Sequence, residues 1–159
     1  EAIDRASRRI TLTHAYFIPD RDILRGLLAA AERGVDVRLL VPAASNHVVA
    51  DWLSRGLYST LLRGGVRIFL YRDAMIHAKT ATVDGRWSTI GTANIDRLSL
   101  TGNYEVNVEI YHDGVAAQLE QIFRTDCTNA DELVLADWSS RPLLAKIGEA
   151  VLAPLRPLV

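Results

Sequence analysis

The stretch that decides the fold is "RRITLTHAYFIPDRDILRGLLAAAERGVDVRLLVP", residues 8–42. Apolar residues alternate at its start, which predicts a strand that runs into a loop. Asp20 is a good N-cap, so a helix is predicted from there to Gly34. The apolar run of residues 35–42 predicts a second strand. A strand, a helix and a strand in this order favour two parallel neighbouring strands.

The rest of the chain continues this alternation. We expect helices at residues 46–63 and 114–125 and from Pro142 onward, and strands at 66–71, 77–84, 86–91 and 103–111. Asp84-Gly85 between two of these strands is a favoured hairpin dipeptide. The sequence therefore predicts one α/β domain over residues 1–159, with helices layered on a mixed, mostly parallel sheet.

The composition limits the class of protein. The chain has 159 residues, 49% of them apolar and 23% charged, which is typical of a soluble globular domain. Its net charge of −1 gives no basic surplus of the kind that nucleic-acid-binding proteins carry. Cys127 is the only cysteine, so no internal disulfide can form. Because the chain starts at Glu1 rather than Met, we expect it to be a piece of a longer protein.

A second stretch, "MIHAKTATVDGRWSTIGTAN" at residues 75–94, carries the chemistry. His77 and Lys79 are two residues apart on a predicted strand, so their side chains point to one face. The ammonium group repels cations, so the pair favours an anion such as phosphate over a metal ion. Neutral histidine is a nucleophile near pH 7 and can form a covalent phosphoryl intermediate. Asn94 and Thr92 supply an amide and a hydroxyl for the same anion.

A catalytic histidine needs a group that orients its ring. Glu105 lies on the polar face of the strand predicted at residues 103–111, and a half-buried carboxylate there requires a partner. We expect that partner to be His77. The opposite face of the strand is apolar and predicted to be buried: Tyr104, Val106, Val108 and Ile110.

Taken singly, each of these residues has an ordinary structural explanation, but six residue types at fixed spacing indicate a site. The spacing H-x-K-x(4)-D-x(6)-G-[S/T]-x-N resembles the signature of the phospholipase D superfamily. The residues that match it are His77, Lys79, Asp84, Gly91, Thr92 and Asn94, followed by Glu105 eleven positions later. "AYFIPD", "LLRGGVRIFLY" and "NYEVN" extend the resemblance to the C-terminal half of bacterial cardiolipin synthases. Two departures are Thr92, where serine is usual, and "DRLS" in place of the commoner D-x-R-S.

The resemblance implies a layered α-β-α phospholipase D-like domain and a reaction that needs no metal or other cofactor. Family members use two copies of the motif, which face each other. One histidine attacks the phosphorus, and the other protonates the leaving alcohol. His77 is then either the nucleophile or the general acid/base.

The resemblance also implies the site residues. The catalytic set is His77, Lys79, Asp84, Asn94 and Glu105, and the phosphate-binding set is Lys79, Thr92 and Asn94. Glu105 is expected to orient His77. Asp84 belongs to the same motif but is expected to fix the hairpin turn.

The motif occurs once, because His14, His47 and His112 each lack a lysine two residues on. His14 and His47 are not expected to be catalytic. The second half of the site would come from upstream in a parent chain or from a second copy in a homodimer. At the end of the first predicted strand, Tyr16 and Phe17 are either near the site, where ligands of α/β sheets gather, or core aromatics.

An upstream second half implies a phosphatidyltransferase of the cardiolipin synthase type. Its substrate would be a phosphatidylglycerol-like phospholipid, and it would lie peripherally on the cytoplasmic side of the bacterial cytoplasmic membrane. A homodimer implies a phosphodiesterase or endonuclease instead, but the net charge of −1 does not favour nucleic acid as a partner. A non-catalytic interaction module is a third alternative, and the intact motif argues against it.

Overall fold

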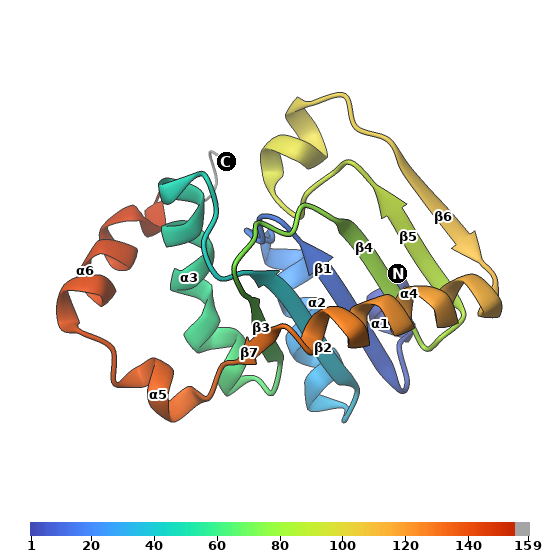
Figure 1. The fold of residues 1–159 in the computed structure, drawn as a ribbon, viewed down its shortest axis with the longest axis horizontal. Coiled ribbons are helices and arrows are strands. Elements are labelled where there is room, and N and C mark those ends of the chain that lie inside the picture. Colours follow the sequence, from blue (N-terminus) through green and yellow to red (C-terminus); the bar gives the residue numbers. More distant parts are fainter. Residues whose placement is uncertain (155–159) are drawn as a thin grey trace.

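The computed structural model of the chain describes residues 1–154 and shows a seven-stranded sheet with helices on both sides (Figure 1). The strand order is β6-β5-β4-β1-β2-β3-β7. The strands are β1 (Arg9–His14), β2 (Asp36–Pro42), β3 (Arg67–Tyr71), β4 (Lys79–Val83), β5 (Trp87–Gly91), β6 (Asn107–Tyr111) and β7 (Ala130–Glu132). The helices are α1 (Ala2–Arg5), α2 (Arg21–Glu32), α3 (Val48–Arg63), α4 (Asp113–Cys127), α5 (Leu135–Ser139) and α6 (Leu143–Leu152), with a short π-helical turn at Leu98–Gly102.

The layered α/β fold with a mixed sheet is confirmed. In the centre of the sheet, β1 pairs with β2 and β2 with β3 in parallel, as the strand-helix-strand pattern predicts. The parallel region ends there, because β4 and β7 flank these three strands antiparallel and β5 and β6 continue the antiparallel part. The sheet is therefore parallel at its centre and antiparallel toward both edges.

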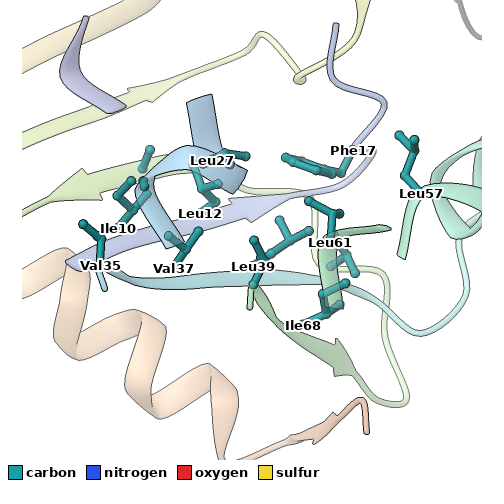
Figure 2. Close-up of a cluster of buried hydrophobic side chains, with 14 of the residues drawn as sticks. Ile10, Leu12, Phe17, Leu27, Val35, Val37, Leu39, Leu57, Leu61 and Ile68 are labelled. Carbon is teal, nitrogen blue, oxygen red and sulfur yellow. The ribbon is translucent and has the colours of Figure 1, made fainter. Parts of the chain in front are cut away.

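The centre of the sheet is buried on both faces, which explains the unbroken apolar run of β2. Leu39 packs in one cluster with Leu27 of α2 and Leu61 of α3, whereas its neighbour Leu40 packs on the opposite face with Phe123 of α4. Figure 1 shows α4 crossing one face and α2 lying behind the sheet. Figure 2 shows the larger cluster, which includes Ile10, Leu12, Phe17, Val37, Leu39 and Ile68. Alternate residues of each strand thus serve two separate cores.

Local signals in the sequence fix the ends of the elements. Oδ1 of Asp20 accepts hydrogen bonds from the backbone N–H groups of Asp22 and Ile23, at 3.0 and 2.8 Å, so the predicted N-cap of α2 is confirmed. At the hairpin, Asp84 and Gly85 both have positive φ, at 55° and 69°. This is the conformation of a type I′ turn, which matches the twist of the flanking strands.

The prediction for the last strand of the motif region is wrong in extent. β6 starts at Asn107 rather than at residue 103. Tyr104 is fully exposed, and Val106 and Val108 are 69% and 53% exposed, so the predicted buried face does not form. The physical reason is position: β6 is the edge strand, and the described residues leave its first part uncovered. No helix within residues 1–154 combines the length and apolar character needed to span a bilayer.

Candidate active site

Except for Asp84, the motif residues gather where β4 begins and where β1 and β5 end, at the upper edge of the sheet in Figure 1. Lys79 is the first residue of β4 and stands opposite His14, the last residue of β1. Because β4 is antiparallel to both β1 and β5, the start of β4 meets the ends of both neighbours. His77 lies two residues before the start of β4, so it is in a loop and not on the strand predicted at residues 77–84, and Asn94 lies three residues after the end of β5. This edge therefore collects one loop before β4 and one loop after each of the strands beside it.

His77 and Lys79 are in direct contact. The Nζ atom of Lys79 lies 2.9 Å from Nδ1 and 3.1 Å from Nε2 of the His77 ring, and it donates to the His77 carbonyl at 3.0 Å. The two residues differ in burial, since His77 is exposed and Lys79 is only 8% exposed. An exposed imidazole above a buried ammonium group can meet an anion that arrives from solvent.

Burial lowers the pKa of Lys79, while the negative charges of Glu105 and Asp96 act in the opposite direction. Asp96 is itself buried and accepts a hydrogen bond of 2.6 Å from the backbone N–H of Ser99. The two carboxylates therefore provide counter-charge for the buried ammonium group. Asp96 begins the "DRLS" segment, but no role was predicted for its carboxylate from the sequence.

Glu105 does not contact His77 as expected. Among the described residues, no hydrogen bond joins its carboxylate to the imidazole ring, and its electrostatic interaction is with Lys79. The half-buried position of Glu105 at this edge agrees with the sequence prediction. Its placement favours an effect on the lysine charge more directly than on the orientation of the histidine ring.

Two buried polar atoms next to Lys79 lack a partner within the described part of the chain: Oδ1 of Asn94 and Nδ1 of His14. Both residues and Lys79 line a cavity of about 140 Å³. A buried polar atom without a partner costs about 1–3 kcal/mol, so the fold alone gives no reason for the placement of the Asn94 amide. Burial, and then the charge of Lys79, lower the pKa of His14 to about 3, so His14 is neutral near pH 7.

Thr92 uses its hydroxyl within the protein. Its Oγ1 atom accepts a hydrogen bond of 3.0 Å from the backbone N–H of Val106, and its own N–H donates to the Val106 carbonyl at 3.0 Å. These bonds continue the ladder between β5 and β6 beyond the last residue of β5. The Thr92 side chain is exposed at the same edge as Asn94.

Asp84 lies apart from the other motif residues. It follows the far end of β4, five residues beyond Lys79 along an extended strand, or roughly 17 Å. Its carboxylate accepts hydrogen bonds from the backbone N–H groups of Ser7, Arg8 and Arg9, at 2.8, 2.7 and 2.9 Å. Partial burial acts to raise its pKa, but these bonds hold the pKa below its usual value. Its position does not support direct participation in catalysis, and it agrees with the expected role at the hairpin turn.

Tyr16 and Phe17, which follow the end of β1, have different surroundings: Tyr16 lies near the site and Phe17 in the core. Phe17 is fully buried in the larger apolar cluster. The ring of Tyr16 lies 6.4 Å from that of His77 and 5.7 Å from that of His47, and its hydroxyl donates to Oδ1 of Asn46 at 2.6 Å.

Beside this cluster lies a cleft of about 440 Å³. Its lining includes Tyr16, His47, Val48, Val49, Asn94 and Asp96. We refer to it below as the Asn94 cleft. No group of three or more histidine, cysteine or carboxylate side chains able to hold a metal ion occurs within residues 1–154.

Comparisons with known proteins agree with this geometry. Residues 1–127 match the family model described as "Cardiolipin synthase, PLD-like domain". A cardiolipin synthase of Clostridium perfringens is 32% identical over 157 residues, which is 99% of this chain and 33% of that protein. The chain thus spans about a third of the length of the curated relatives it matches.

Two solved structures show the same fold. The phospholipase D family member Nuc from Salmonella typhimurium has a TM-score of 0.71 and 23% identity, and the match covers 83% of this chain and 86% of Nuc. Phosphatidylserine synthase from Haemophilus influenzae has a TM-score of 0.77 and 14% identity, covering 99% of this chain and 43% of that protein. With four-fifths of its residues matched by the family model, the chain belongs to the phospholipase D-like domain family of cardiolipin synthases.

Proposed function

We propose that the chain supplies one of the two half-sites of a phosphatidyltransferase of the cardiolipin synthase type. The observation that carries this proposal is the His77 imidazole in contact with the buried ammonium group of Lys79, which lines one cavity with Asn94, whose side-chain NH₂ group can donate. These groups suit a phosphodiester, which needs a nucleophile or proton donor, a positive charge and hydrogen-bond donors. The substrate would be a phospholipid such as phosphatidylglycerol.

The proposed reaction has two steps, formation of a phosphohistidine and transfer of the phosphatidyl group to the acceptor. A histidine nitrogen attacks the phosphorus, the bond to the leaving alcohol breaks, and a second histidine gives that alcohol its proton. The glycerol hydroxyl of another phosphatidylglycerol then loses its proton to the second histidine and displaces the first, so that cardiolipin forms and glycerol has been released. His77 fills one of these two roles. Lys79 and Asn94 hold the phosphate oxygens and stabilise the charge that develops on them.

A single half-site lacks the second histidine. We propose that the complementary half lies upstream in a longer parent chain, with a second copy of this chain as the alternative. The complete site would lie at a membrane surface on the cytoplasmic side, with the protein bound peripherally. The share of its relatives that this chain covers, about a third, supports the first arrangement.

The test is phosphatidyl transfer on phosphatidylglycerol vesicles, with cardiolipin and glycerol measured by mass spectrometry. In the protein that contains this chain, His77→Ala should lower the rate by at least about a thousandfold, because the nucleophile or the proton donor is lost. His112→Asn is the matched control, since His112 caps α4 at the opposite end of β6 and lies outside the proposed site. Rates that fall equally in the two variants, or turnover retained in His77→Ala, would remove the assignment.

A further measurement separates this chemistry from metal-dependent hydrolysis. The proposed reaction needs no metal ion, so EDTA should leave the rate unchanged. Strong inhibition by EDTA that added metal reverses would indicate a metal phosphodiesterase instead. Hydrolysis of single-stranded DNA at a rate exceeding that of phosphatidyl transfer would favour the endonuclease alternative.

A further inference from the structure

The Asn94 cleft begins where the proposed phosphate site ends. Asn94 lines both the cleft and the small cavity beside Lys79. Tyr16 also connects the two regions, because its ring lies 6.4 Å from that of His77 and 5.7 Å from that of His47. A phosphodiester held by Lys79 and Asn94 would therefore extend one of its two alcohol substituents into the cleft.

Two apolar side chains in the cleft have no role in the core. Val48 and Val49, the first residues of α3, are 68% and 54% exposed. The same helix packs on the sheet through other residues, among them Leu57 and Leu61, which belong to the larger buried cluster. Exposed valines at the start of a helix do not help it to form, since β-branched residues are weak helix formers. Their position in the cleft suits an apolar ligand.

The charge of the cleft also suits an apolar ligand. Among the described residues, its lining contains no lysine or arginine, and the ionisable groups there include the carboxylate of Asp96. A nucleic acid strand carries a phosphate on every nucleotide and needs several cations along its path. A phospholipid carries its negative charge at the phosphodiester and is apolar beyond the ester groups. The cleft complements the second kind of substrate.

We infer that the Asn94 cleft holds the glycerol backbone and the first acyl carbons of the phospholipid, with Val48 and Val49 in contact with the acyl chains. This inference rests on the proposed function, and it assigns a lipid subsite to α3. It makes the start of α3 the segment that selects a diacyl substrate over a water-soluble phosphodiester.

Rate measurements test the selection. The double variant Val48→Ser/Val49→Ser should lower kcat/KM for long-chain phosphatidylglycerol in mixed micelles roughly ten- to a hundredfold, because two apolar contacts are lost. It should change kcat/KM for bis(4-nitrophenyl) phosphate by less than about twofold. Val151→Ser is the matched control, because Val151 is 69% exposed on α6 and is not part of the cleft lining. An equal loss in the control variant, or on the soluble substrate, would overturn the inference.

Crosslinking gives a readout that does not need turnover. Phosphatidylglycerol with a diazirine on an acyl carbon near the glycerol should label peptides that contain residues 46–50, both in the wild-type protein and in His77→Ala. Labelling confined to other segments would overturn the subsite. Labelling at residues 46–50 in a wild-type protein that forms no cardiolipin would keep the subsite and reject the proposed reaction, so the two failures are distinguishable.

Discussion

The most specific stability prediction concerns the histidine buried beside Lys79. His14 is 5% exposed, and burial together with the nearby ammonium group lowers its pKa from 6.5 to about 3. In the unfolded chain it binds a proton below about pH 6.5, whereas in the folded protein it stays neutral to about pH 3. Neutral His14 therefore contributes stability that is present above pH 6.5 and is lost as the pH falls toward 3. Each pH unit within this interval changes the free energy of unfolding by about 1.4 kcal/mol.

The assay is urea denaturation at pH 7.5 and pH 4.5, followed by circular dichroism. The wild-type protein should lose about 3 kcal/mol between these two values through His14, since pH 4.5 lies two units below 6.5. The matched variant His14→Gln cannot be protonated, so its free energy of unfolding should fall by about 3 kcal/mol less over the same interval. Other titrating groups are shared by both proteins and cancel in the comparison. Equal losses in the two proteins would refute the reasoning, because they would show that His14 does not resist protonation.

Three other substitutions test the fold. Asp84→Ala should lower the free energy of unfolding in urea by about 1–3 kcal/mol, because three backbone N–H groups lose a charged acceptor; no change would reject this anchoring role. Gly91→Ala should cost about 1–3 kcal/mol in thermal denaturation, since a Cβ there would overlap the side chain of Asn107; an unaltered melting temperature would contradict that overlap. Leu61→Ala should cost about 2–5 kcal/mol in urea, while Leu144→Ala, at an 81% exposed position, should cost under about 0.5 kcal/mol; similar costs would contradict the burial of α3.

The central part of the fold was predictable because its signals are local. Asp20 marks the start of α2, and Asp84-Gly85 marks the hairpin, since each position needs a particular side chain or backbone conformation. The edge strand was not predictable in the same way. The alternation of Tyr104, Val106 and Val108 is the pattern of a half-buried strand, but burial depends on what lies above the strand, and no described element covers these residues. Periodicity reports the spacing of apolar residues and not the presence of a covering layer.

The candidate site was also only partly predictable from the sequence. His77 and Lys79 were found from their spacing, because residues two apart along the chain remain close whichever element they occupy. Glu105 was predicted to orient His77, but no hydrogen bond joins the two among the described residues, and the charge of Glu105 raises the pKa of Lys79. The positions of His14 and Asp96 beside Lys79 could not be predicted, because they reach the site only through the pairing of β1 with β4 and through a buried loop. Contacts of this kind depend on strand order, which the motif does not contain.

The hydrogen bonds of Asp84 have a consequence for the site at the opposite end of β4. The carboxylate accepts hydrogen bonds from the backbone just before β1 and at its first residue. These bonds fix the register between β4 and β1. A slip by one residue would turn every side chain of β4 to the other face of the sheet, and the ammonium group of Lys79 would point toward α4 instead of toward Asn94. Asp84 thus helps to keep Lys79 in register with β1, although the two residues lie at opposite ends of β4.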